Sequence, residues 1–228
     1  MGHYSYPREV RTLEYTPYDR SPFEYASLGC HYMDDLVMLR GTVKALLENP
    51  HGRKWSLQGF GMLRLYISPV HRLHVWHPRF GVTGIFGSSV HTHPWDFASC
   101  ILNGAITNIR YMKTAGRGFI PGAEQYNEQT IKCGPGGCAM SEPQSTWLIP
   151  CNPETYGVGQ RYSQRAEEIH RSEPTPGTVT AIERRFKEDT EHAQVYWQGN
   201  RWVSAEPRPA TAEEIEDITQ AALAVWEA

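Results

Sequence analysis

From residue 60 onward, the sequence is dominated by short runs in which apolar and polar residues alternate. Examples are "MLRLYIS" at 62–68 and "RLHVWH" at 72–77, and clusters of Gly, Pro, Asn and Ser separate the runs. Alternation with a period of two is typical of strands, and frequent turn residues are typical of antiparallel sheets. The sequence therefore predicts a mainly β protein, folded as an antiparallel sandwich or barrel over residues 60–205.

Two helices are predicted to flank these strands. Residues 31–50 carry leucines and a valine at helical spacing, with acidic residues near the start and an Asn-Pro pair at the end. Residues 211–227 begin with Thr211 and, three positions later, Glu214, which is the capping-box pattern, and an apolar stripe follows. We therefore expect one helix before the strands and one after them.

Residues 1–30 are expected to form an irregular arm, and the whole chain, residues 1–228, is expected to form a single domain. The chain has 22 basic and 25 acidic residues, a net charge of -3, so neither nucleic acid nor a membrane surface is an expected partner. No run approaches the roughly 20 apolar residues of a membrane span, and the polar start "MGHYSY" lacks the apolar segment of a signal peptide. Five cysteines argue against a disulfide framework, and we expect a cytoplasmic protein.

Two histidines stand one residue apart in "SSVHTHPWDF". On a strand, His91 and His93 point to the same face, about 7 Å apart at Cα. That spacing suits two neighbouring positions around one metal ion, which then needs a third ligand from another strand. The best candidate is His170 in "AEEIHRS", with Glu168 on the same face of that strand. A single histidine in a β protein is usually structural or exposed, so the prediction depends on the combination.

These motifs resemble those of the cupin family. The first cupin motif has a Gly, then His-x-His on a strand, then a Glu, then a Gly at the next hairpin; Gly87, His91, His93 and Gly104 match it, and the later His170 matches the second motif. The resemblance covers roughly residues 60–185. It implies a cupin barrel, or double-stranded β-helix, that holds a metal ion. The cupin Glu position is not Glu here, so the implied site has three histidines, with Asp96 or Glu168 as alternatives for a fourth ligand.

The resemblance also implies a cofactor and partners. The cofactor would be a divalent metal, with Fe(II) favoured and Zn, Ni or Mn as alternatives, and the partner a small-molecule ligand. Cupins often form homodimers by exchanging strands, and residues 1–30 are the candidate for the exchanged segment. Three-histidine cupins include thiol dioxygenases such as cysteine dioxygenase. That subfamily often has a cysteine shortly after the histidine pair, where this chain has Ala98, so the thiol substrate is not carried over.

Further polar residues alternate on the predicted strands around this site. The candidates for acid, base or orientation of the ligands are Tyr162, Glu168 and Asp96. The candidates for substrate binding are Arg64, Tyr66, His74, Asn108 and Arg110. An arginine that faces the interior would indicate an anionic substrate, because a buried guanidinium requires a carboxylate or phosphate partner.

Three functions remain open at this point. The favoured one is a mononuclear metal enzyme, a non-haem iron oxygenase, because three neutral histidines leave coordination positions open for substrate and O₂. The second is a protein that binds and sequesters a small ligand without turnover. The third is an isomerase or epimerase of sugar nucleotides, in which the histidines and Tyr162 would transfer protons. The fold alone cannot choose among them.

Overall fold

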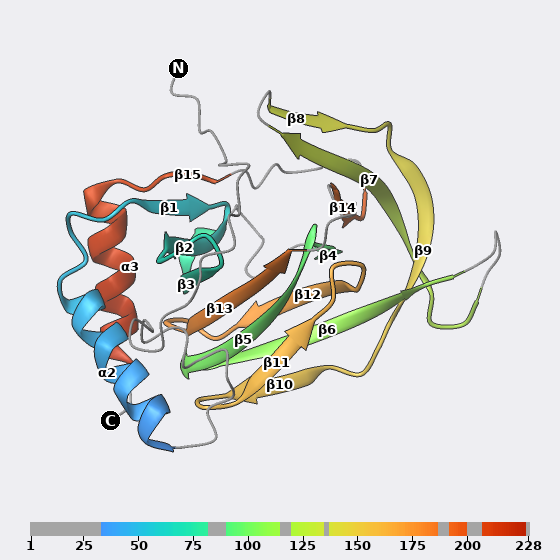
Figure 1. The fold of residues 1–228 in the computed structure, drawn as a ribbon. Coiled ribbons are helices and arrows are strands. Elements are labelled where there is room, and N and C mark those ends of the chain that lie inside the picture. The colour runs from blue at the N-terminus through green and yellow to red at the C-terminus, as the bar shows by residue number, and fades with distance from the viewer. Residues whose placement is uncertain are drawn as a thin grey trace, which may run out of the picture.

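The computed structural model describes residues 33–81, 90–114, 120–134, 137–186, 192–199 and 207–226. The predicted arm at residues 1–30 and the motif glycine Gly87 lie outside these ranges. Within them the protein is mainly β, with two antiparallel sheets in a jelly-roll arrangement and a helix near each end (Figure 1). The predicted fold class is confirmed, and the arrangement is compatible with a cupin barrel.

The two sheets place strands that are distant in the sequence side by side. Sheet A has the order β11 (Arg161–Gln164), β5 (Trp95–Asn103), β13 (Val179–Phe186), β3 (His71–Gly81), β2 (Phe60–Tyr66), β1 (Trp55–Gln58) and β15 (Arg208–Pro209). Sheet B has the order β10 (Glu154–Gly157), β6 (Ala105–Lys113), β12 (Ile169–Pro174), β4 (Val90–His91), β14 (His192–Trp197), β7 (Glu124–Gly134) and β8 (Gly137–Met140). A further strand, β9 (Gln144–Pro150), pairs with β6 and β7.

Helices α2 (Met33–Glu48) and α3 (Ala212–Ala224) lie side by side against the outer face of sheet A (Figure 1). The capping box at the start of α3 is present as predicted: the Thr211 hydroxyl accepts from the Glu214 amide, and the Glu214 carboxylate accepts from the Thr211 amide. Among the described residues, no helix is both long enough and apolar enough to span a bilayer.

Strand β2 shows how the sequence alternation is used. Leu63 and Leu65 are buried in the core between sheet A and the helices. Arg64, between them, points to the opposite face and lines a cavity between the two sheets. Burial of Leu63 and Leu65 between the outer face of sheet A and the helices is favourable by roughly 1.5–3 kcal/mol for each side chain. The inner face of the strand is therefore available for polar groups.

The hairpin that joins β5 to β6 turns at Gly104. The φ angle of this residue is +72°, a left-handed conformation that side chains other than glycine rarely adopt. The hydroxyls of Thr175 and Thr178 accept hydrogen bonds from the backbone amide of Ala105, which follows the glycine. The turn thus holds β5, β6 and the segment before β13 together at one end of the barrel.

Candidate metal centre

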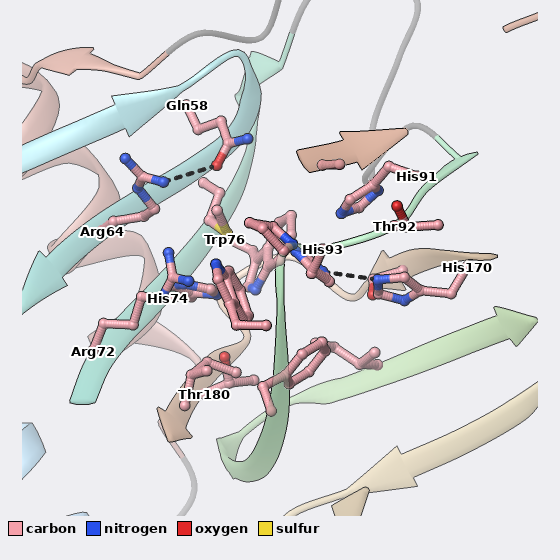
Figure 2. A pocket seen from close by; sticks show the side chains of 18 of the residues that line it. Gln58, Arg64, Arg72, His74, Trp76, His91, Thr92, His93, His170 and Thr180 are labelled. Carbon is pink, nitrogen blue, oxygen red and sulfur yellow. Dashed lines mark hydrogen bonds between the residues drawn. The ribbon is translucent and has the colours of Figure 1, made fainter. Parts of the chain in front are cut away.

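Three histidines converge on the inner side of sheet B, although they come from distant parts of the chain. His91 ends β4 and pairs in register with His170 on β12, and His93 follows two residues later. Their nearest ligand nitrogens all lie within 4.8 Å of one another, and the Nε2 atoms of His93 and His170 are 3.0 Å apart (Figure 2). The predicted triad is therefore one cluster, and it is the group among the described residues whose geometry could hold a metal ion.

The chemistry of the cluster fits a divalent metal ion. Burial lowers the pKa of His93 and of His170 well below the usual value, and the neighbouring His91 lowers both further. Both imidazoles are therefore neutral at pH 7, as metal ligation requires. Three imidazole nitrogens suit Zn, Fe, Ni or Cu better than Mg or Ca, so the donor set supports a divalent transition metal without selecting one.

Asn108 on β6 orients His170. The Nδ1–H of His170 donates to Oδ1 of Asn108 at 2.9 Å, and because an amide oxygen only accepts, this bond leaves Nε2 of His170 with a lone pair for a metal. The Asn108 amide in turn donates to Oε1 of Gln164 at 3.1 Å, and Gln164 donates to the backbone oxygen of Glu168. The side chains of His170, Asn108 and Gln164 are all buried.

The turn between β11 and β12 holds the segment that carries His93. The backbone amide of His93 donates to the carbonyl of Ala166, and the Ala166 amide donates to Oδ1 of Asp96 at 2.7 Å. Glu168 accepts from the backbone amide of Arg165 at 2.9 Å in the same turn. Glu168 also pairs with Arg110, at 3.9 Å from its Nε atom. Neither Asp96 nor Glu168 is among the described residues that line the cavity, and their catalytic or ligand roles stay predictions.

The triad opens onto a cavity of about 230 Å³ between the two sheets (Figure 2). The wall near the triad is formed by sheet B, and the opposite wall by sheet A. The polar residues of the cavity wall are Gln58, Arg64, Arg72, His74, Thr92, Ser172 and Thr180, besides the triad. Aromatic and aliphatic side chains form most of the remaining lining, with Trp76, Trp95, Phe97 and Tyr162 as the largest of them.

Trp95 connects the triad to a group of arginines on sheet A. Its ring stacks on the imidazole of His93, with centroids 4.3 Å apart and planes 25° apart. The guanidinium of Arg72 lies over the indole, 4.4 Å from the ring centroid, and the guanidinium of Arg184 lies 5.5 Å from it. Both arginines are buried, and contacts of this kind contribute roughly 0.5–2 kcal/mol each. The stacked indole restricts the orientation of the His93 ring.

The predicted substrate-binding residues separate into two groups. Arg64 and His74 line the cavity. Tyr66 is 41% exposed and is not among the described lining residues; its ring lies 5.3–5.6 Å from the guanidinium groups of Arg64, Arg72 and Arg184. Asn108 contacts His170 rather than the cavity, and Arg110 forms ion pairs with Glu154 and Glu168 at the edge of sheet B.

Of the predicted catalytic residues, Tyr162 lines the cavity and is buried. Burial raises the pKa of its hydroxyl, and hydrogen bonds to Ser99 and Ser172 oppose part of that rise. The phenol is therefore protonated at neutral pH. It can donate a hydrogen bond to a ligand but is a poor base.

Sequence reasoning did not single out Arg72, Trp95 or Thr180. Two of them carried a local signal, because Arg72 is two residues before His74 and Trp95 is two after His93, which is the strand period. Thr180 had no such signal, since it reaches the cavity only through the pairing of β13 with β3.

The fold and the triad together define a jelly-roll β protein with a candidate transition-metal centre in its interior. No family profile matches the sequence, and no curated protein matches it. Among solved structures, the chain is similar to hydroquinone 1,2-dioxygenase PnpCD, in a complex with Cd²⁺ and 4-hydroxybenzonitrile. The TM-score is 0.29 with 10% identity, over 55% of this chain and 63% of that chain. The match spans less than two thirds of that chain.

Removing the amide that orients His170 is expected to weaken metal binding. In Asn108→Leu, the Nδ1–H of His170 loses its acceptor, so the ring and its tautomer are no longer fixed, and we expect a 10- to 100-fold rise in the metal Kd, about the usual effect of losing such a partner. Asn108→Asp keeps an acceptor oxygen at this position and is expected to bind metal more tightly than the leucine variant. Competition with a chelator measures both constants, and equal Kd values for Asn108→Leu and the parent would exclude the orienting role.

Proposed function

We propose that this protein is a mononuclear metal-dependent enzyme of the cupin type, and specifically a non-haem iron oxygenase acting on a small molecule. The observation that supports the proposal is the position of His91, His93 and His170 on the wall of a cavity between the two sheets that is large enough for a small substrate. A structural metal site is normally closed by four protein ligands, whereas a catalytic site leaves positions open. The described residues supply three.

An Fe(II) ion held by the three histidines would supply redox chemistry with O₂ at coordination positions that the protein leaves open. The residues around it have their own tasks. Asn108 holds His170 with Nε2 toward the cluster, and Trp95 fixes the ring of His93. Phe97 lies 5.1 Å from the His93 ring and 5.9 Å from the His170 ring, between centroids, and gives the triad an apolar neighbour.

The chemistry of Tyr162 weighs against the isomerase alternative. That reaction would require a base in the cavity, and the phenol of Tyr162, with its raised pKa, retains its proton at neutral pH. In the proposed enzyme, His93 and His170 hold the metal and do not act as bases. A ligand-binding protein without turnover uses the same cavity, so it is the alternative that the experiment must separate from the oxygenase.

The test uses protein purified without a metal-affinity tag, from which co-purified ligands are identified by mass spectrometry. The protein is then loaded with Fe(II) under nitrogen and exposed to O₂ while oxygen consumption is recorded. We expect O₂ uptake and a ligand mass increased by added oxygen, and no uptake from protein loaded with Zn. A ligand recovered intact after exposure to Fe(II) and air would instead support the sequestering protein.

A further inference from the structure

A row of polar side chains crosses the inner face of sheet A, at the end of the cavity away from the triad (Figure 2). His74 on β3 pairs in register with Arg64 on β2 and with Thr180 on β13. Residues opposite each other in an antiparallel pair point to the same face, with Cβ atoms about 5 Å apart. The three side chains therefore form one continuous polar strip, and all three line the cavity.

Several polar atoms at this end are buried and lack a hydrogen-bond partner. Among the described residues, nothing pairs with Nε2 of His74, Oγ1 of Thr180 or Nε1 of Trp76. Each of these side chains is at least nine-tenths buried and lines the cavity. Buried polar groups are rarely left unsatisfied in a native protein. The indole nitrogen can only donate, so the group that satisfies it must be an acceptor.

The electrostatics of this end favour an acceptor with a negative charge. The described residues that line the cavity include Arg64 and Arg72 but no aspartate or glutamate. Burial lowers the pKa of His74 well below its usual value, and the charges of Arg72, Arg64 and Arg184 lower it further. His74 is therefore neutral and adds no charge of its own, while the guanidinium groups make the local potential positive. A planar carboxylate matches the fork of an arginine.

The middle of the cavity is apolar. Met62, Phe97, Ile106, Ile182 and the ring of Tyr162 line the cavity and belong to one apolar cluster with Trp76. This cluster contacts His74 of the polar row through Trp76, and His93 and His170 of the triad through Phe97. A cavity of about 150 Å³ with an apolar lining is known to hold one benzene molecule. The 230 Å³ here therefore has room for a body of one ring and a substituent.

From these four observations we propose that the cavity binds a small organic acid. Its carboxylate lies on the row of Arg64, His74 and Thr180, and its apolar body, about one ring in size, fills the middle of the cavity. The proposal rests on the proposed function only in that the other end of this acid would meet the metal. The carboxylate site itself requires no metal.

The test is calorimetric titration of metal-free and metal-loaded protein with benzoate, and with benzamide as its neutral equivalent in shape. We expect benzoate to bind at least about tenfold more tightly than benzamide in both forms. Arg64→Met and Thr180→Val should each weaken benzoate about 10- to 100-fold. Thr180→Ser keeps the hydroxyl and should restore most of the affinity. Thr155→Val is the matched control, since that exposed hydroxyl contacts Thr107 outside the cavity.

The proposal is overturned if benzamide binds as tightly as benzoate, or if Arg64→Met and Thr180→Val both stay within about twofold of the parent. The absence of saturable benzoate binding overturns it as well, because water alone then satisfies the polar row. Metal content is measured on the same samples. Protein that takes up metal but does not bind benzoate refutes the carboxylate site and leaves the metal enzyme standing. Protein that binds benzoate but takes up no metal when metal is supplied supports the carboxylate site and refutes the metal enzyme.

Discussion

Protein in which His170 is replaced by alanine is expected to lose its stoichiometric metal. His170 is buried, pairs in register with His91 and lies 3.0 Å from His93 between Nε2 atoms, so it supplies one of the three nitrogens that could hold the metal. Loss of a residue that merely orients a ligand costs about 10- to 100-fold in metal affinity, and loss of the ligand itself should exceed that. Two histidines would then retain only weak binding.

The measurement is elemental analysis of tag-free protein after gel filtration in buffer without added metal. His91→Ala should behave like His170→Ala, because both remove one of three nitrogens from the same cluster. His192→Ala is the matched control: this exposed histidine lies on β14 and is not part of the cluster. Full metal occupancy in both triad variants would show that the ligand assignment is wrong. Circular dichroism of each variant separates loss of metal from loss of fold.

The triad could be predicted from the sequence because its signal is local. His91 and His93 are separated by one residue, so any extended backbone brings their side chains to one side, and their rings do lie 4.6 Å apart. Strand β4 ends at His91. His93 therefore lies just beyond the strand that was expected to carry both histidines, and the two rings still lie on one side. His170 was found from its similar strand context and from the resemblance to a cupin motif.

The opposite end of the cavity could be predicted only in part, because it depends on strand order. Alternation on β2 correctly separated Arg64 from Leu63 and Leu65, but it could not say which face held the cavity, since both faces of sheet A are covered. The row that joins Arg64 to Thr180 requires the order β2, β3, β13, and more than a hundred residues separate the two in the chain. No local pattern encodes that register.

Carboxylates were the least predictable group. Asp96 and Glu168 stand next to metal-ligand positions in the sequence, which made them candidates for acid, base or fourth ligand. In the structure both accept hydrogen bonds from backbone amides of the turn at residues 165–168. An acidic side chain close to a turn has this alternative partner available, and sequence distance to a histidine does not distinguish the two uses.

A second large effect is expected on stability, from Gly104→Ala in the β5–β6 turn. A Cβ at this position would lie 2.5 Å from Oγ1 and 3.0 Å from Cα of Thr178, and 3.0 Å from Oγ1 of Thr175. Thr178 is fully buried, and its hydroxyl donates to the carbonyl of Thr175 at 2.7 Å, so it cannot move without breaking that bond. The positive φ adds about 1–2 kcal/mol, and one or two broken hydrogen bonds add about 1 kcal/mol each.

We therefore expect the free energy of unfolding to fall by about 2–4 kcal/mol in Gly104→Ala, measured by urea denaturation with an unchanged m-value. Gly52→Ala is the matched control. Its φ is +77°, close to that of Gly104, but an added Cβ there meets no atom within 4 Å, so it should lose only the backbone contribution. If the free energy of unfolding falls by the same amount in the two variants, the close approach of Thr178 does not contribute to the effect. A larger loss in Gly104→Ala shows that two features require glycine at position 104. One is the positive φ angle of the turn, and the other is the close packing of the β12–β13 segment against it.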